Sequence, residues 1–485
     1  MADEEAKPGF ADAIFGSVAS GIEHVIAPEE KTAWHDITKN WLSLTVWVEY
    51  VGDWCISRGG FLVGIYVPLF IATANLLPEF TTLVGGWLLF GFPVYGPFAA
   101  IYAFWGAWIW FAQSLFTYKK TEPVLLEVKM PPNVMKSPRA MEQVFSNLWV
   151  RYSETTFIDR NWYGGKRPYF SFELVSLGGE VHFYIWTKGA FRNTIEMNLY
   201  AQYPEVEIVE AEDYSKKFVY DDSVECFVTE YPLESRSADQ PEPDSEYYAE
   251  INAYQPKTYI DYELDKDPKD ELRVDPFASV IEVLSTCNKE EQMWVQIVIR
   301  SHLSSDWKEA VEGVVEKIRL ESTQLKDDGD QSDDAGFPRP TWKQTEQIRT
   351  MERHLSKLPF EVGIRGIYCA PANKMRSPEF TAMRWIFRPY ANPNWMSMFR
   401  PRRGHNIFDY AWQDWNGIRW RLFSRRFIDA YRRRCFFGYP WKTPFNVLSV
   451  ETLATIWHPP SNTVKAPGLA RIPTKKAEAP SNLPV

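Results

Sequence analysis

The stretch YFSFELVSLGGEVHFYIW, from Tyr169 to Trp186, decides how the centre of this chain folds. Apolar residues recur at every second position on both sides of the pair Gly178-Gly179, which is the pattern of two strands with a buried face. Two adjacent glycines readily supply the positive φ angles of a tight hairpin turn. The sequence therefore predicts an antiparallel β-hairpin that turns at these glycines.

Further elements follow on both sides of this hairpin. Upstream, Pro123–Pro131 has the composition of a strand, and Ser137–Trp149 begins with a potential N-cap and carries one apolar face. Downstream, the apolar residues of Phe191–Leu199 are four apart, as in a helix, and Glu205–Asp213 alternates as a strand. The order β-α-β-β-α-β predicts a ferredoxin-like lobe with a split βαβ arrangement.

The same order of elements recurs in the second half of the chain. The expected elements are a strand in Tyr248–Leu264, a helix in Asp275–Cys287, a strand at Glu291–His302, a helical insertion, a strand at Phe360–Ala370, a helix near Pro378–Arg388 and a closing strand near Leu453–Trp457. The predicted fold class is therefore α+β, with two tandem ferredoxin-like lobes, the second carrying the insertion, behind an N-terminal transmembrane helical hairpin.

The transmembrane hairpin is predicted from residues 59–118, which contain a single charged residue. The eighteen uncharged residues Phe61–Pro78 reach the lower limit for a membrane-spanning helix. In the second uncharged stretch, we expect Pro93 and Pro97 to break the helix and leave a span near Gly96–Phe116. A buried helical hairpin of a soluble core is the alternative, but such cores rarely keep so long an uncharged run.

Basic residues flank this hairpin, with Arg58 before it and Lys119-Lys120 after it. The positive-inside rule then puts both flanks in the cytoplasm. The expected location is the inner membrane, with more than one pass and with the large domain facing the cytoplasm. A third short span would instead separate the N-terminus from the large domain.

The predicted organisation has six parts. They are N-terminal cytoplasmic or interfacial helices at 1–58, the transmembrane hairpin at 59–118, the first lobe at 119–233, an acidic linker at 234–246, the second lobe at 247–458 and a disordered, linker-like tail at 459–485.

The sequence contains no recognisable catalytic or metal-binding motif. The five Cys are far apart and never form CxxC, and the seven His are equally scattered, which argues against a disulfide framework or a structural zinc site. The string YGGKRP at Tyr163–Pro168 lacks the first Gly and the Ser/Thr of a P-loop. We therefore expect no enzyme and no cofactor. The net charge of −10 also argues against generic nucleic-acid binding by the whole chain.

One segment, 395–441, is unusually rich in arginine and aromatic residues. Between Arg400 and Arg434 there are ten Arg, no Lys and three Asp, interleaved with aromatic residues. Guanidinium groups bind phosphate bidentately, and aromatic rings stack on bases or sit at headgroup depth. The candidate contact residues are Arg419, Arg421, Arg425, Arg426, Arg432, Arg433 and Arg434.

Three interpretations of these arginines stay open. They bind anionic lipid headgroups beside the membrane anchor, they bind the DNA backbone, or they pair with an acidic surface of this protein or of a partner. The third is the most common role of a charge run.

Several blocks of sequence together resemble an uncharacterised bacterial membrane-protein family. The blocks are PVLLEVKMP…SPRAMEQVF, SFELVSLGGEVHFYIW, NLYAQYPEVEIVEAEDY, DPFASVIEVL…EEQMWVQIVIR and ETLATIWHPPSNTVKAPGLARIPTKKAEAPSNLPV. Members of that family have a membrane hairpin followed by this domain, and many continue into a P-loop ATPase similar to type IV secretion and conjugative DNA-transfer ATPases. The resemblance covers Pro123 to Val485, and this sequence departs from the longer members by lacking the motor domain.

This resemblance implies the membrane-proximal, non-ATPase part of a conjugation-like or secretion-like machine that transfers DNA or protein. The expected function is a membrane-anchored, non-enzymatic adaptor for a separate P-loop ATPase. The expected partners are the membrane, that ATPase, anionic lipid or DNA, and further copies of the chain as a homo-oligomer. A lipid-contact or nucleic-acid-contact module is the alternative, and a membrane-associated enzyme is a further one that nothing in the sequence favours.

Overall fold

The structure is a computed structural model of the 485-residue chain. It describes residues 68–119, 122–131, 134, 136–151, 156–221, 223–233, 246–266, 274–322, 339–372, 374–392, 396–401, 418–438, 441–461, 464, 468–469 and 471. The chain divides into two compact units, 1–107 and 108–485.

The described part of the first unit is helical. A helix at Pro68–Leu76 is followed by α5 (Pro78–Lys119), which is 42 residues long and continues into the second unit. No single helix among the described residues is long and apolar enough to cross a membrane. Pro68–Leu76 and Pro78–Val94, which meet at a bend of 120°, reach that length and composition only as a pair.

The expected helix break at Pro93 and Pro97 is wrong, because both prolines lie inside α5. A proline removes one i→i−4 hydrogen bond and crowds the preceding turn. In a helix as long as α5, the hydrogen bonds of the neighbouring residues keep the helix continuous. Residues 59–67 of the predicted transmembrane hairpin, and all of the predicted N-terminal helices at 1–58, lie outside the described residues.

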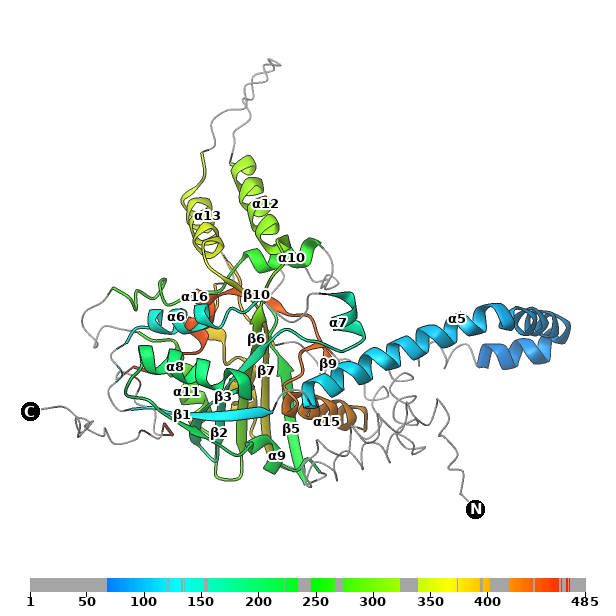
Figure 1. Cartoon of the computed structure of the whole chain (residues 1–485), viewed down its shortest axis with the longest axis horizontal. Coiled ribbons are helices and arrows are strands. Elements are labelled where there is room, and N and C mark those ends of the chain that lie inside the picture. The colour runs from blue at the N-terminus through cyan, green and yellow to red at the C-terminus, as the bar shows by residue number, and fades with distance from the viewer. Residues whose placement is uncertain are drawn as a thin grey trace, which may run out of the picture. The chain divides into compact units, whose positions relative to one another are not determined.

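The second unit is built on an antiparallel sheet in the order β10-β7-β6-β2-β3-β1-β4, with β5 also paired to β7. Figure 1 shows this sheet at the centre of the unit. The strands are β1 (Pro123–Lys129), β2 (Tyr169–Leu177), β3 (Glu180–Lys188), β4 (Glu207–Glu210), β5 (Val224–Glu230), β6 (Gln292–Ser301), β7 (Pro359–Pro371) and β10 (Asn446–Ser449).

Helices connect these strands. They are α6 (Arg139–Asn147), α7 (Phe157–Asn161), α8 (Arg192–Gln202), α9 (Tyr214–Lys217), α10 (Glu246–Ala253), α11 (Phe277–Ser285), α12 (Asp306–Glu321), α13 (Trp342–Leu355), α14 (Ser377–Arg384), α15 (Ile418–Arg432) and α16 (Val450–Ile456). A short hairpin of β8 (Phe437–Gly438) and β9 (Trp441–Lys442) follows α15. The chain is thus α+β with an antiparallel sheet and many helices.

The hairpin predicted from Tyr169 to Trp186 is confirmed as β2 and β3, which pair from Ser171↔Trp186 to Leu177↔Glu180. Gly178 and Gly179 form the turn with φ angles of +63° and +95°. Residues that carry a side chain rarely adopt such positive φ angles. The elements predicted around the hairpin are also confirmed, as β1, α6, α8 and β4.

The second half of the sheet departs from its prediction at both ends. The strand expected in Tyr248–Leu264 is wrong, because this stretch forms α10 and turns. The closing strand expected near Leu453–Trp457 is also wrong, because these residues belong to α16 and the residue after it. Every residue of α16 is buried, and a short apolar run that is buried all round has no period that separates helix from strand.

Two strands differ from the prediction: β10 lies earlier in the chain than the expected closing strand, and β5 was not expected. β10 lies just before α16, where the Ser449 side chain caps the helix by accepting from the backbone of Thr452 at 3.4 Å. β5 was not predicted, and it pairs with the last seven residues of β7. β2 and β6 pair over nine residues, from Tyr169↔Arg300 to Leu177↔Gln292, so one sheet continues through both predicted lobes.

Both faces of the sheet are covered. Figure 1 shows α6, α8, α11 and α16 gathered on one side and α15 on the other. The first face carries the larger apolar core, to which alternate residues such as Phe172, Ile297 and Ile364 contribute. The opposite face packs under α9 and α15, and its apolar core includes Trp294 and Ile367.

The structure corrects the argument against disulfides. Cys226 of β5 and Cys369 of β7 stand directly opposite each other in the sheet, with 4.2 Å between their Cα atoms, and are joined as a disulfide. They are 143 residues apart in sequence. The pairing depends on the register of two strands, so the spacing of the cysteines along the chain does not predict it.

The beginning of the predicted disordered tail is packed against the domain where the structure describes it. Val181 donates a backbone hydrogen bond to Gly468 at 2.8 Å, and Leu469 and Arg471 form parallel bridges with Val181 and Met130. A side chain at Gly468 would collide with the carbonyl oxygen of Gly179. Residues 472–485 lie outside the described part of the chain.

Candidate functional site at helix α15

Helix α15 carries most of the predicted contact arginines. Its apolar residues recur every three or four positions, which gives one face that packs on the sheet. Phe427, Ile428 and Tyr431 are buried in that contact, and Trp420 and Phe423 pack against its edge. The arginines between these positions are thereby turned to other sides of the helix.

Three arginines in the middle of α15 are exposed. Arg421, Arg425 and Arg426 are exposed. Arg421 and Arg425 are four residues apart and so lie on the same side of the helix. Arg419 lies in the first turn of α15.

The last arginines of the predicted set are bound within the protein. Arg432 donates through Nε to the carbonyl oxygen of Ser215 at 2.9 Å and through Nη2 to that of Phe218. Arg433 pairs with Asp429 one turn earlier, at 2.8 Å. For these residues and Arg434, pairing inside the protein is the interpretation that the geometry favours.

Arg434 is completely buried at the end of α15. Its Nε and Nη2 atoms donate to the two carboxylate oxygens of Glu173 at 3.0 and 3.2 Å, and Nη1 donates to Asp213 at 2.5 Å. Burial acts to lower the pKa of the guanidinium, but the facing carboxylates of Glu173 and Asp213 raise it overall above the ordinary value. The ion pairs therefore keep this buried arginine charged.

The backbone at Arg434 adopts a conformation that normally selects glycine. The φ angle of Arg434 is +50°. Its backbone N–H donates a hydrogen bond to the carbonyl oxygen of Tyr431, and the N–H of Cys435 donates to the carbonyl oxygen of Ala430 at 3.0 Å. These two bonds form the Schellman ending of a helix, in which the left-handed residue is usually Gly. An L-residue there costs about 1–2 kcal/mol, so the side chain of Arg434 must offset that cost through its ion pairs.

Glu173 belongs to a polar row that crosses the sheet beneath α15. The row consists of Glu173 (β2), Gln296 (β6), Arg365 (β7) and Glu230 (β5), which are directly opposed in the strand register. Gln296 donates to Glu173 at 3.0 Å, and Arg365 lies 3.7 Å from Glu230. Burial lowers the pKa of Arg365 to about 10.

Two tyrosines join the polar row to the covering helices. Tyr214 of α9 donates to Glu173 at 2.7 Å, and its hydroxyl lies 2.8 Å from that of Tyr431 of α15. Ser171 donates to Glu173 as well, at 2.6 Å. Burial raises the pKa of both tyrosines well above the ordinary value, so both hydroxyls keep their protons at neutral pH. These bonds fix α15 in one orientation on the sheet.

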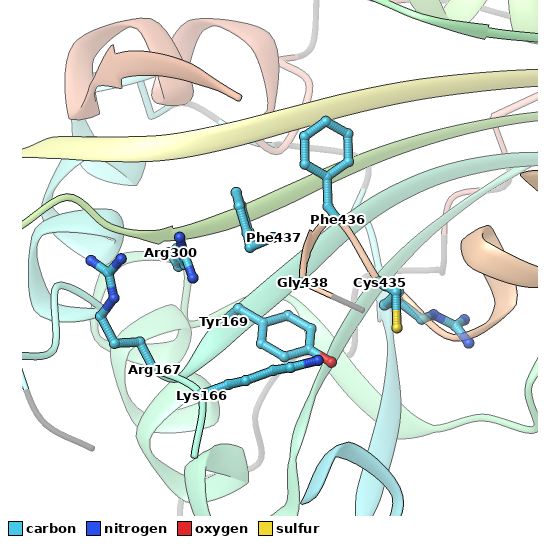
Figure 2. Close-up of a pocket in the computed structure, with 9 residues that line it drawn as sticks. Lys166, Arg167, Tyr169, Arg300, Cys435, Phe436, Phe437 and Gly438 are labelled. Carbon is cyan, nitrogen blue, oxygen red and sulfur yellow. The ribbon is translucent and has the colours of Figure 1, made fainter. Parts of the chain in front are cut away.

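A shallow hollow, with room for about one water molecule, lies beside the end of α15 and opens partly to solvent. In Figure 2, Lys166 runs alongside the ring of Tyr169 toward Cys435, whereas Arg167 and Arg300 lie toward the other end. Both arginines pair with Glu361, at 3.1 and 2.5 Å. The hollow is thus lined mainly by cationic and aromatic groups.

Cys435 borders the hollow, but burial raises the pKa of its thiol, and a nucleophilic cysteine requires a lowered value. Among the described residues, no group of three His, Cys, Asp or Glu side chains is arranged to hold a metal ion.

Sequence reasoning missed the polar row. Its signal is a long polar or charged residue in the middle of each of three mostly apolar strands, in FELV, WVQIV and VGIRGIY. Each residue alone looks like an ordinary strand position. Only the register shows that Glu173, Gln296 and Arg365 are neighbours.

The comparisons with known proteins return no relative. No family model matches the chain, and no curated protein and no solved structure matches it.

Proposed function

We propose that this chain is a membrane-anchored, non-enzymatic adaptor of a type IV secretion-like or conjugation-like transfer system. In this proposal, the helix Pro68–Leu76 and α5 together form the hairpin that anchors the chain in the inner membrane, and the α+β unit holds a separate P-loop ATPase on the cytoplasmic side. The observation that carries the anchoring is the exposed apolar surface of α5. The transfer system and the ATPase rest on the sequence blocks that resemble the bacterial membrane-protein family.

The surface of α5 has the composition of a lipid-facing helix. Large side chains such as Trp87, Phe90, Phe98 and Tyr102 are between 71% and 83% exposed. Exposed apolar surface of this extent is rare on a soluble protein and marks a contact with lipid or with another protein. Within residues 78–118, Glu79 is the only charged residue, which favours lipid as the contact.

The proposal extends to a duplicated fold. The strand order β2-β3-β1-β4, with every neighbour antiparallel, is the one expected of a split βαβ lobe. A second lobe would use β5, β6, β7 and β10, with α12 and α13 as its insertion. Two lobes joined edge to edge through β2 and β6 would form a wide, rigid platform for a partner.

The adaptor role is tested by isolating the tagged full chain from membranes in a mild detergent. We expect a P-loop ATPase to be retained with it, and the chain to stay in the membrane fraction after alkaline carbonate washing. Membrane retention without any ATPase would reject the adaptor role. Loss of the chain from the membrane fraction would reject the anchor.

The exposed arginines of α15 favour a second candidate, contact with an anionic partner such as DNA or acidic lipid. Arg421 and Arg425 share one side of a helix whose orientation is fixed by the polar row. Binding to DNA through such groups weakens with salt, and the slope of log K against log[salt] is about −0.9 for each phosphate contacted.

Replacing Arg421 and Arg425 with Gln tests this second candidate. We expect the salt slope of DNA binding to become shallower by about 2 units. Arg349→Gln on α13 is the matched control, because its side chain is 78% exposed and belongs to a different helix. An unchanged slope in the double variant rejects DNA contact, and liposome flotation with and without anionic lipid tests the lipid version.

A further inference from the structure

The shallow hollow beside the end of α15 is formed by segments that are far apart in the sequence. Lys166 and Arg167 come from the loop before β2, Arg300 comes from β6, and Arg434 follows α15. Figure 2 shows side chains from these segments around one space. Four of the nine described residues that line the hollow are thus cationic, and none of the nine is a carboxylate.

The two arginines at one end of the hollow are held in place from behind. Arg167 donates to the carbonyl oxygen of Ser301 at 2.8 Å and to Glu361 at 3.1 Å. Arg300 pairs with the same carboxylate, and its guanidinium lies 4.5 Å from the centre of the Phe437 ring. The side chain of Glu361 is only 4% exposed and lies outside the lining. The positions of both cations are therefore fixed before any ligand arrives, which lowers the cost of binding.

Lys166, which is 9% exposed, exerts its charge on two neighbouring side chains. Burial, and then the like charge of Lys166, lowers the pKa of Lys188 to about 8. Burial raises the pKa of the Cys435 thiol, and Lys166 is the largest of the charges that act against that rise. Water screens a charge poorly at a site from which it is largely excluded. The same field attracts an anion to the hollow.

The size of the hollow limits which anion fits. It has room for about one water molecule and opens partly to solvent. Phosphate, sulfate and carboxylate groups contain several heavy atoms and are too large for this space. A halide ion is a single atom only slightly larger than a water molecule. The aromatic residues of the lining are compatible with a halide, because the edge of an aromatic ring carries partial positive charge.

We propose that this hollow binds one chloride ion, attracted by the ammonium group of Lys166 and by the guanidinium groups of Arg167 and Arg300. The ion joins the loop before β2 to β6 and to the residues that follow α15. A water molecule is the competing occupant, since it has nearly the same size. The cationic lining favours the anion over water. Neither the membrane anchor nor the ATPase enters into this proposal, so it stands or falls separately from the adaptor role.

The proposal is tested on the full chain, purified in an uncharged detergent and a sodium gluconate buffer. Sodium chloride is added at constant ionic strength, and the line width of the chlorine NMR signal reports the chloride that exchanges with the protein. Sodium bromide and sodium sulfate are then added separately as competitors. We expect bromide to remove the protein-dependent broadening, because it is also a single-atom anion, and sulfate to leave most of it.

Two variants assign the broadening to the hollow. Lys166→Met removes the ammonium group and keeps a side chain of similar length, and we expect the protein-dependent broadening to fall several-fold. Lys308→Met is the matched control, because Lys308 is an exposed lysine of α12 outside the lining, and we expect no change. If Lys166→Met does not fold, the comparison of bromide with sulfate on the unmodified chain decides.

Three results overturn the proposal. The first is the absence of protein-dependent broadening in the unmodified chain, which leaves water as the occupant. The second is displacement by sulfate as effective as displacement by bromide, which assigns the chloride to exposed cations such as Arg425. The third is undiminished broadening in folded Lys166→Met, which places the ion elsewhere on the protein.

Discussion

The two faces of the central sheet differ in how they are held together. Phe172, Ile297 and Ile364 form a row across β2, β6 and β7 that faces the larger apolar core. One residue further along, Glu173, Gln296 and Arg365 form the polar row on the opposite face. Both rows are completely buried, yet the first relies on packing and the second on directional bonds.

This difference teaches what each face contributes. Apolar packing is non-directional and tolerates substitutions that conserve volume. Buried ion pairs contribute little net stability, because desolvation offsets their attraction, but loss of one partner is strongly destabilising. The apolar face therefore supplies stability, and the polar row sets the single orientation in which α15 covers the sheet.

The largest effect is expected for Arg434→Met. The substitution leaves Glu173 and Asp213 buried without their cation, which we expect to cost about 4 kcal/mol of folding free energy, measured by urea denaturation. Adding Glu173→Gln should recover part of this loss. Arg434→Gly is the control for the backbone, because it relieves the positive φ while still removing the ion pairs. A loss below about 1 kcal/mol would contradict the role given to the polar row.

A smaller effect is expected on the apolar face, for Ile297→Ala. The cavity should cost about 3 kcal/mol, whereas Ile297→Val should cost only about 1 kcal/mol. The same denaturation measurement applies. If Ile297→Val lowered the free energy of unfolding as much as Ile297→Ala, this face would not tolerate small changes in volume. Its packing would then be as specific as the hydrogen bonds of the polar row.

The third effect concerns Glu361, which lies on the same face as the polar row and pairs with Arg300 and Arg167. Burial acts to raise the pKa of this carboxyl, but His302 and the two arginines outweigh it and lower the pKa to about 2. The unfolded chain therefore binds the proton more readily, and stability falls as pH drops from about 4.5 toward 2. We expect about 2 kcal/mol to be lost by pH 3.

Glu361→Gln tests this acid-sensitive contribution. The variant should be less stable at pH 7 and should show a flatter dependence of unfolding free energy on pH between 4.5 and 3. An unchanged slope would assign the acid sensitivity to other carboxylates.

A smaller loss of stability, which begins at a higher pH, is expected from His354 of α13. Its Nδ1 lies 2.7 Å from the Ser449 hydroxyl. Burial, assisted by Arg353, lowers the pKa of this imidazole to about 3. Since the unfolded value is near 6.5, protonation favours the unfolded chain below that pH, and stability falls. We expect about 1 kcal/mol to be lost between pH 7 and 5.5.

This window separates His354 from Glu361, because the carboxyl contributes only below about pH 4.5. His354→Gln should abolish the slope between pH 7 and 5.5 and leave the acidic transition in place. A slope that persists in the variant would show that another group titrates there.

The smallest effect is expected for Arg425→Gln, on the exposed side of α15. Surface substitutions usually change stability by less than about 0.5 kcal/mol, so thermal and urea denaturation should be unaffected. A clear loss of stability would show that Arg425 belongs with the structural arginines and would remove it from the candidate contact set.

Some local features were predictable because their information lies in neighbouring residues. The alternation around Gly178-Gly179 predicted β2 and β3, and the apolar spacing of Asp275–Cys287 predicted α11. Other local features were not. The apolar run near Leu453–Trp457 was predicted to be a strand and is mostly α16, because a segment buried on all sides shows no amphipathic period.

By itself, the sequence determined the hairpin, most of the helices and strands, and the concentration of arginines at α15. The tertiary structure decided which of those arginines face solvent, and that Cys226 pairs with Cys369. It also decided that Glu173 meets Arg434 across 261 residues of chain. The physical reason is that these contacts depend on strand register and on the packing of α15, and both arise only when distant segments are brought together.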